Sequence, residues 1–348
     1  MINISQKNKI NLLKALAIML VVSGHLEFSL IPMFPPYSFQ LALFFFISGM
    51  VFKSDYGFVE FFKKRFKSLL IPYFLYSFVY LGITVLMAPI MGKFWGMEIN
   101  LYNEFMVPFL TGHQLDLISP LWFVPQLFMT LIVYHLLNKI NTKTIVYVIF
   151  ALAAIQLGKY RENLYVLFIL KTLFSLLFVH LGFLYKTRIE GKLNIFNHKI
   201  FFFVIGLEAL LWLSNKDYTQ QDGIGLSYVL AWGEFDNWIV PILTSITGIW
   251  ISLFIIEIAF EKIKNIDFLH EIGQNTYHIM ANHIFVFNII TYCCLYLRGI
   301  PFNIKNNADI YWFYCPLKMT YFYFVLGIFI PILIGEGLKY LKSRLFSK

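Results

Sequence analysis

Long apolar stretches alternate with short basic segments along almost the whole chain. Runs of roughly 17 to 25 mainly apolar residues are long enough to cross a bilayer as an α-helix. By this criterion we predict ten helices, at 10–31, 38–53, 68–91, 121–138, 143–158, 163–185, 199–214, 238–260, 276–297 and 319–341. The second and the fifth are short. A further apolar patch at 224–232 is too short to span, so we expect a re-entrant or surface segment there.

The composition agrees with a membrane protein rather than a soluble one. Hydrophobic residues make up 59% of the 348 residues and charged residues only 14%, whereas soluble domains have about 25% charged residues. A large soluble core does not explain this difference, because a soluble surface still needs polar residues. We therefore predict an all-α, polytopic membrane bundle that forms a single transmembrane domain over residues 1–348, with no separate soluble domain.

The basic residues orient the predicted helices. With ten spans, both ends of the chain face the same side of the membrane. Of the 28 Lys and Arg residues we assign 19 to that side and 7 to the other, and Lys14 and Lys171 fall inside helices. By the positive-inside rule both termini are predicted to be cytoplasmic. We expect no cleaved signal peptide, since the first apolar stretch has full span length, and we expect a multi-pass protein of the inner (cytoplasmic) membrane.

The net charge of +9 does not indicate a nucleic-acid partner, because the basic residues are spread between apolar spans and act first as topology signals. The lipid bilayer is the expected surrounding partner. The cysteines Cys293, Cys294 and Cys315 are odd in number and lack the spacing of metal ligands. We therefore expect neither a disulfide framework nor a metal site.

Two ionisable residues lie inside the first predicted helix, where hydrocarbon makes charge costly. Lys14 and His25 are separated by about 20° beyond three full turns, so they share one helix face, about 16 Å apart along the axis. Such a polar stripe should face the bundle or a wet cavity. Histidine is the most frequent general base, so His25 is a candidate for proton transfer. Snorkelling of Lys14 and a hydrogen-bonded core role for His25 are the alternatives.

Two further stretches combine apolar and special residues. "FFFISGMVF" at 44–52 contains Ser48 and Gly49, whose small size favours close helix packing over a nucleophilic role for Ser48. "FFKKRFKSLLIPYF" at 61–74 has four basic residues directly before a span, with Pro72 expected to kink the helix. The basic cluster is either a topology anchor that contacts anionic lipid or a site for a polyanion such as a nucleotide-bearing cofactor.

Two later stretches are candidates for substrate contact. "SPLWFVPQLF" at 119–128 contains Trp122, which is either an interfacial belt residue or a platform for a sugar ring. "IGQNTYHIMANHIFVF" at 272–287 places Asn282 and His283 deep in the ninth helix. A histidine at that depth is a functional candidate, because buried polar groups in a membrane are expensive.

These stretches, taken in order, resemble the acyltransferase-3 family of integral membrane acyltransferases. The fucose 4-O-acetylase-like branch is the most similar, with polysaccharide O-acetyltransferases around it. The similarity rests on the basic residue and histidine of the first helix, and on four motifs: FFFISGM, KKRFKSLLIPY, PLWFVPQLF and IGQNTYHIMANH. It covers nearly the whole chain.

The resemblance implies roles for the donor side. His25 matches the family's catalytic base, and Lys14 stands where many relatives have arginine. The family's basic pair before the third span binds the acyl-CoA donor. Here that pair is altered, so Lys64, Arg65 and Lys67 are all candidates for the phosphates of acetyl-CoA.

The implied reaction is transfer of an acetyl group from cytoplasmic acetyl-CoA to a sugar hydroxyl of a cell-envelope polysaccharide or its lipid-linked precursor. Trp122, Asn282 and His283 are the candidate contacts for this acceptor, and no metal is required. A transporter or flippase for a lipid-linked sugar is the main alternative. Against it, the sequence shows neither a two-fold hydropathy repeat nor paired broken helices.

Overall fold

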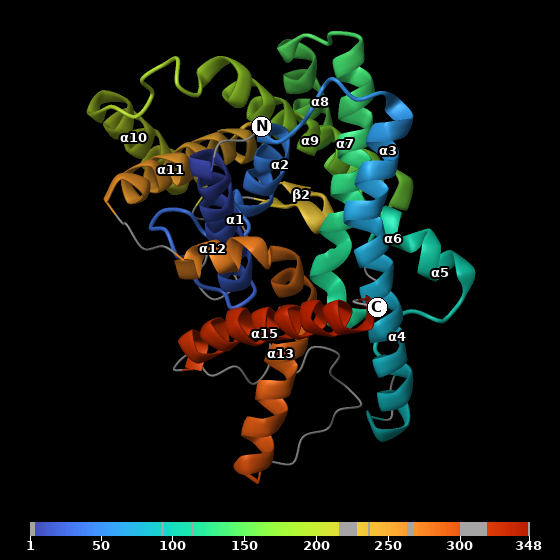
Figure 1. The fold of residues 1–348 in the computed structure, drawn as a ribbon. Coiled ribbons are helices and arrows are strands. Elements are labelled where there is room, and N and C mark those ends of the chain that lie inside the picture. Colours follow the sequence, from blue (N-terminus) through green and yellow to red (C-terminus); the bar gives the residue numbers. More distant parts are fainter. Residues whose placement is uncertain are drawn as a thin grey trace. The chain divides into compact units, whose positions relative to one another are not determined.

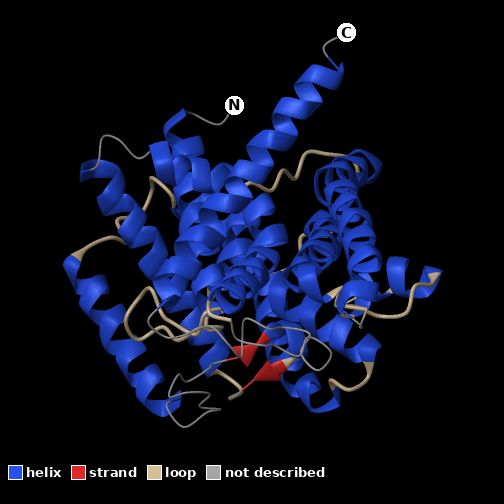
Figure 2. Cartoon of the chain, turned by 90° about the horizontal axis from the view of Figure 1, so that it is seen from below, coloured by secondary structure: helices blue, strands red, loops and turns tan. Residues whose placement is uncertain are grey.

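The computed structural model describes residues 4–91, 94–112, 114–215, 228–235, 237–262, 267–299 and 319–346. Within these ranges the chain is nearly all helical (Figure 1), which confirms the all-α part of the predicted fold class. The strands β1 (Tyr228–Val229) and β2 (Glu234–Phe235) form a short antiparallel pair, drawn in red in Figure 2. The chain divides into two compact units, which are Met1–Phe66 with Gln126–Gly273 (unit 1) and Lys67–Pro125 with Gln274–Lys348 (unit 2).

Unit 1 is a bundle whose central helix pairs are α2 with α9 and α8 with α9, while α1 packs on α2 and α11 and α10 packs on α11. Its helices are α1 (Ile4–Gly24), α2 (Gln40–Met50), α3 (Phe58–Arg65), most of α7 (Phe123–Lys139), α8 (Thr144–Leu157), α9 (Leu164–Leu184), α10 (His198–Asn215), α11 (Val240–Lys262) and α12 (Asp267–Gln274). A π-helical turn, η4 (Tyr185–Ile189), extends α9.

Unit 2 is built around α13 (Thr276–Leu297), which packs against α15 (Thr320–Phe346) and against the 3-10 turn η2 (Asp116–Trp122). It also contains α4 (Ile71–Met91), α5 (Leu101–Phe105) and α6 (Val107–Leu110). A π-helical turn, η1 (Phe66–Leu70), joins α3 to α4. This irregular turn lies directly before Pro72, where the sequence predicts a disturbed helix.

Each of the ten predicted apolar segments contains a helix. Six helical stretches in the described part are long and apolar enough to cross a membrane: 58–89, 116–139, 164–189, 240–258, 276–297 and 320–340. Helix α2 and the stretch 144–160 are apolar but shorter. The count of ten spans and the cytoplasmic termini stay predictions. Of the patch at 224–232, residues 224–227 lie outside the described residues, and the remainder forms β1 and a 3-10 turn.

The first helix is shorter than predicted, because the chain turns directly after His25. The N–H groups of Glu27 and Phe28 donate to the carbonyls of Gly24 (3.1 Å) and Ser23 (3.2 Å). This pair of bonds forms a Schellman C-cap, with Glu27 at φ 58° in the left-handed position that usually carries glycine. The N–H of His25 still bonds to a carbonyl four residues back (3.1 Å). His25 is therefore the last residue in the helical ladder of α1.

Helices α2 and α9 cross at two glycines. A Cβ atom on Gly49 would lie 2.0 Å from the carbonyl oxygen of Val179, and one on Gly182 would lie 1.9 Å from that of Phe46. The Ser48 hydroxyl donates to the Phe44 carbonyl of its own helix (2.9 Å). The close packing expected at Ser48 and Gly49 is thus present, since each helix touches the backbone of the other.

Candidate functional site

His25 follows directly after α1 and contacts the loop that leads to α2. Its Nδ1 atom lies 3.5 Å from the hydroxyl of Tyr37. The two rings meet edge-on, with an interplanar angle of 89° and centroids 6.0 Å apart. The imidazole therefore packs against an aromatic side chain.

Lys14 lies on the same helix, which is continuous from Lys14 to His25. The predicted shared face is consistent with this unbroken helical geometry. The Lys14 side chain is half-buried, and its two neighbours in the sequence, Leu13 and Ala15, are fully buried. Among the residues that the structure describes, no carboxylate lies within ion-pair distance of the Lys14 ammonium. Its charge is therefore not neutralised by these residues.

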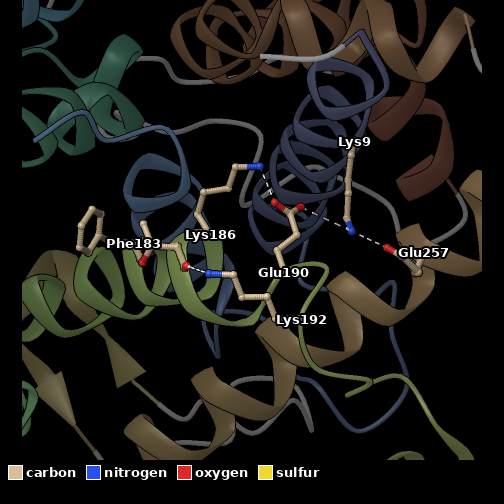
Figure 3. A network of polar contacts seen from close by, with 7 residues as sticks. Lys9, Phe183, Lys186, Glu190, Lys192 and Glu257 are labelled. Atoms are coloured by element: carbon tan, nitrogen blue, oxygen red, sulfur yellow. Dashed lines mark hydrogen bonds and ion pairs between the residues drawn. The ribbon is translucent and has the colours of Figure 1, made fainter. Parts of the chain in front are cut away.

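The amino-terminal half of α1 is fixed by a cluster of four charged residues, Lys9, Lys186, Glu190 and Glu257 (Figure 3). Lys9 donates to the Glu257 carboxylate and lies 3.8 Å from Glu190 Oε1. Lys186 donates to the same Glu190 carboxylate one helical turn away. The two cations and two anions balance, and they join α1 to η4 and α11. We call this group the Lys9 cluster.

The basic stretch before α4 is partly engaged with neighbouring side chains. Lys64 of α3 donates to Glu60 (2.8 Å), and its ammonium lies 3.7 Å from the ring centroid of Tyr56. Hydrogen bonding from Lys64, with a smaller contribution from Lys53, lowers the pKa of the Tyr56 phenol below its usual value. Lys53 was not among the predicted residues, although it belongs to the same positive surface.

The remaining two predicted cations differ in setting. Arg65, at the end of α3 in unit 1, is half-buried, and its guanidinium lies 5.1 Å from the ring centroid of Phe61. Lys67 is exposed and lies in the π-helical turn η1, in unit 2. The planar fork of Arg65 suits a phosphate, whereas Lys67 offers a mobile point charge.

In unit 2 a polar seam joins α4 to α13. The Tyr76 hydroxyl lies 2.6 Å from His278 Nδ1, and the Tyr80 hydroxyl donates to Asn282 Oδ1 (2.8 Å). The Asn282 amide nitrogen donates to the Tyr76 hydroxyl (3.3 Å) and to the His278 carbonyl (2.6 Å). Both amide hydrogens of Asn282 are therefore used within the seam.

The other two residues predicted to contact the sugar acceptor are also buried. His283 is fully buried, and its Nδ1 lies 2.8 Å from the Ile279 carbonyl, so Nδ1 carries the hydrogen. Trp122 ends η2 and is 6% exposed. A Cβ on Gly112 would lie 2.2 Å from the Trp122 Cβ, so a close backbone approach buries this side of the tryptophan.

The sequence did not single out several residues that make polar contacts in the structure, either in the groups described above or elsewhere in unit 1. Tyr76 and Tyr80 recur four residues apart, and this spacing on an apolar helix could have indicated a polar face. Tyr37 gave no such signal, because its contact with His25 depends on the loop conformation. Glu208 of α10 is buried and accepts from the hydroxyls of Thr244 (2.8 Å) and Thr247 (2.5 Å) on α11.

Cys293 and Cys294 are free thiols in α13, and Cys315 lies outside the described residues. Among the described residues, no group of three histidine, cysteine or acidic side chains is arranged to hold a metal ion.

Comparison with known proteins identifies the family. No curated protein and no solved structure matches the chain. The sequence model of the acyltransferase-3 family, described as an acyltransferase domain, matches residues 7–336. This range includes Lys14, His25 and all four motifs, and it extends over both units. The chain therefore belongs to the acyltransferase-3 family of membrane acyltransferases.

Proposed function

We propose that the protein is a membrane O-acetyltransferase of the fucose 4-O-acetylase-like branch. It moves an acetyl group from cytoplasmic acetyl-CoA to a sugar hydroxyl of a cell-envelope polysaccharide or its lipid-linked precursor. The observation that carries this proposal is the family match along residues 7–336, which includes His25 directly after α1. The same match gives no support to the transporter alternative.

In this mechanism His25 is the general base. Its imidazole takes the proton of the sugar hydroxyl as the oxygen attacks the thioester carbonyl of acetyl-CoA. The new C–O bond gives a tetrahedral intermediate, whose collapse breaks the C–S bond. The CoA thiolate then receives the proton from the imidazolium, so the enzyme returns to its starting state. This direct route needs no acyl-enzyme.

The donor is bound through its negative charge. Arg65 can hold a phosphate with two parallel N–H groups, while Lys64 and Lys67 add point charges nearby in the sequence. Lys14 is a further candidate, because it is half-buried and has no carboxylate partner among the described residues. On this proposal Lys14 contacts a more deeply inserted part of acetyl-CoA.

The acceptor side is assigned to Trp122, Asn282 and His283. Trp122 offers an aromatic face of the kind that packs on a sugar ring. Because both amide hydrogens of Asn282 are used within unit 2, its proposed contact with the sugar goes through Oδ1 or follows an exchange of partners with Tyr76. No metal is proposed for the reaction.

The test compares cells that lack the gene with cells that carry wild type, His25→Ala or His198→Ala. His198 is an exposed histidine at the start of α10, and it serves as the matched control. Mass spectrometry should find acetyl esters on the envelope glycan with wild type and His198→Ala only, at equal protein levels in the membrane. Loss of a general base costs about 100-fold to 10,000-fold in rate. Full acetylation with His25→Ala contradicts the assignment.

The donor site is tested by Arg65→Ala combined with Lys64→Ala. Because these cations are proposed to bind phosphate before the chemical step, the KM for acetyl-CoA should rise while kcat changes less. Lys199→Ala, an exposed lysine of α10, is the control. An unchanged KM in the double variant leaves the cluster only a topology role.

A further inference from the structure

The loop between α1 and α2 brings a second side chain to His25. The Tyr37 hydroxyl lies 3.5 Å from His25 Nδ1, which is longer than the usual distance of about 2.7–3.2 Å for an N–H···O hydrogen bond. The edge-on packing of the two rings adds a second restraint, because aromatic pairs prefer this geometry. Together the two contacts restrict the rotation of the imidazole about its side-chain bonds.

The backbone of this loop is strained. Glu27, Met33 and Tyr37 have φ values of 58°, 66° and 61°, in the left-handed region. The fourth described non-glycine residue with positive φ is Asn141, which is outside the loop. For a residue with a Cβ this conformation costs roughly 1–2 kcal/mol. Such strain persists only where surrounding contacts hold it, and it is enriched at functional sites.

The contacts that hold Tyr37 come from β1 and α11 of the same unit. Its carbonyl accepts from the N–H of Tyr228 (3.4 Å). The next residue, Ser38, is fully buried and donates from its hydroxyl to Pro35 (2.7 Å). The Ser38 carbonyl accepts from the hydroxyl of Ser245 (3.4 Å). The strained backbone at Tyr37 is thus fixed on both sides of the residue.

We propose that Tyr37 is a positioning residue for His25, whose hydroxyl accepts the Nδ1 hydrogen and whose ring fixes the imidazole plane. This inference rests on the proposed function. A neutral histidine carries one ring hydrogen, so a hydrogen at Nδ1 leaves the lone pair for proton transfer on Nε2. Burial, with a smaller contribution from the charge of Glu27, raises the pKa of the Tyr37 phenol, which keeps it neutral.

The test variant is Tyr37→Phe, which keeps the ring and the strained backbone and removes only the hydroxyl. Transfer of labelled acetyl from acetyl-CoA is measured with purified protein in liposomes, using the envelope glycan fraction of cells that lack the gene. We expect kcat to fall about 10-fold, by analogy with the losses of about 10-fold to 100-fold when the hydrogen-bond partner of a metal-bound histidine is removed. The KM for acetyl-CoA should not change. Replacement of Tyr37 by 3-fluorotyrosine, which keeps the hydroxyl, should restore kcat.

The matched control is Tyr134→Phe. It removes the hydroxyl of a buried tyrosine elsewhere in the same unit, which lies 3.2 Å from Nδ1 of another histidine, His180. This variant should keep the wild-type kcat. Equal losses in Tyr37→Phe and Tyr134→Phe overturn the inference, because the effect is then one of packing.

Three further outcomes test this inference and separate it from the function on which it rests. An active Tyr37→Phe beside an inactive His25→Ala overturns the role of Tyr37 and leaves His25 as the base. A loss confined to the KM for acetyl-CoA also overturns it. If His25→Ala or a protein-free control transfers acetyl as fast as wild type, the proposed function is wrong, and the inference is wrong with it.

Discussion

The crossing of α2 and α9 leads to a sharp prediction for Gly49→Ala. The new Cβ would be 2.0 Å from a backbone oxygen of α9, whereas carbon and oxygen atoms in close contact lie about 3.3–3.6 Å apart. The helices must therefore separate locally by roughly 1.3 Å. A gap of 0.5–1 Å already removes about a quarter to a half of the dispersion energy of each contact. Overpacking of this kind costs about 1–3 kcal/mol, which exceeds the gain of about 1 kcal/mol from alanine's helix propensity.

The assay is thermal unfolding of the purified protein in detergent micelles. Gly206→Ala is the matched control, because a Cβ at this helical position of α10 meets no atom within 4 Å. We expect Gly49→Ala to lower Tm by several degrees and Gly206→Ala to leave it unchanged or raise it. Combining Gly49→Ala with Gly182→Ala should cost less than the sum, since the first change already separates the same helices. Equal Tm values for Gly49→Ala and Gly206→Ala would mean that the contact between α2 and α9 tolerates the added carbon, contrary to this prediction.

Three further predictions concern polar contacts. In the Lys9 cluster, Lys9→Glu and Glu257→Lys should each lower Tm. The variant with both changes restores an opposite-charge pair, so a double-mutant cycle should give a coupling energy of about 1 kcal/mol. Additive losses would contradict the ion pair. In unit 2, Asn282→Ala should lower the free energy of unfolding by about 1 kcal/mol, measured by thermal unfolding, because the hydroxyl of Tyr80 loses its hydrogen-bond acceptor. An unchanged Tm would mean that the polar seam adds no stability. Burial raises the pKa of the Glu104 carboxyl above its usual value, so the stability of the wild type should fall as the pH rises through that raised pKa. Glu104→Gln should flatten the dependence of Tm on pH and raise Tm at neutral pH. If the Tm-versus-pH curves of the two proteins run parallel, this prediction is wrong.

The positions of the helices were predictable from the sequence, whereas several of their ends were not. The predicted helix at 276–297 matches α13, because a polar cap region and a long apolar run mark both limits. The first helix ends well before residue 31, although the apolar pattern continues. Its end is set by Glu27, which adopts a left-handed conformation that is usual for glycine and rare for glutamate. Hydropathy contains no information about that choice.

In the candidate site, the residue types were predictable from the sequence, whereas only some of their contact partners were. His25 and Lys14 were identifiable because an ionisable group in a hydrophobic run is conspicuous. The pairing of Lys64 with Glu60 was also readable, since the two residues are one helical turn apart. The contact of His25 with Tyr37 was not readable, because the two residues are twelve positions apart along an irregular loop in which Glu27, Met33 and Tyr37 itself have positive φ values. Local spacing predicts contacts within a helix, and it fails across an irregular loop.

The position of His25 is determined within unit 1 by contacts along the whole of α1. The Lys9 cluster holds its amino-terminal half. A Cβ on Gly273 would lie 2.0 Å from the Asn11 carbonyl oxygen, so α12 touches the backbone of α1 near its middle. Tyr37 contacts the carboxyl-terminal end at His25 itself. A helix restrained at three levels cannot slide along its axis without breaking an ion pair, a backbone contact or a ring contact. The proposed role of His25 as a general base requires such a fixed placement, because small displacements of a reacting group reduce rates strongly.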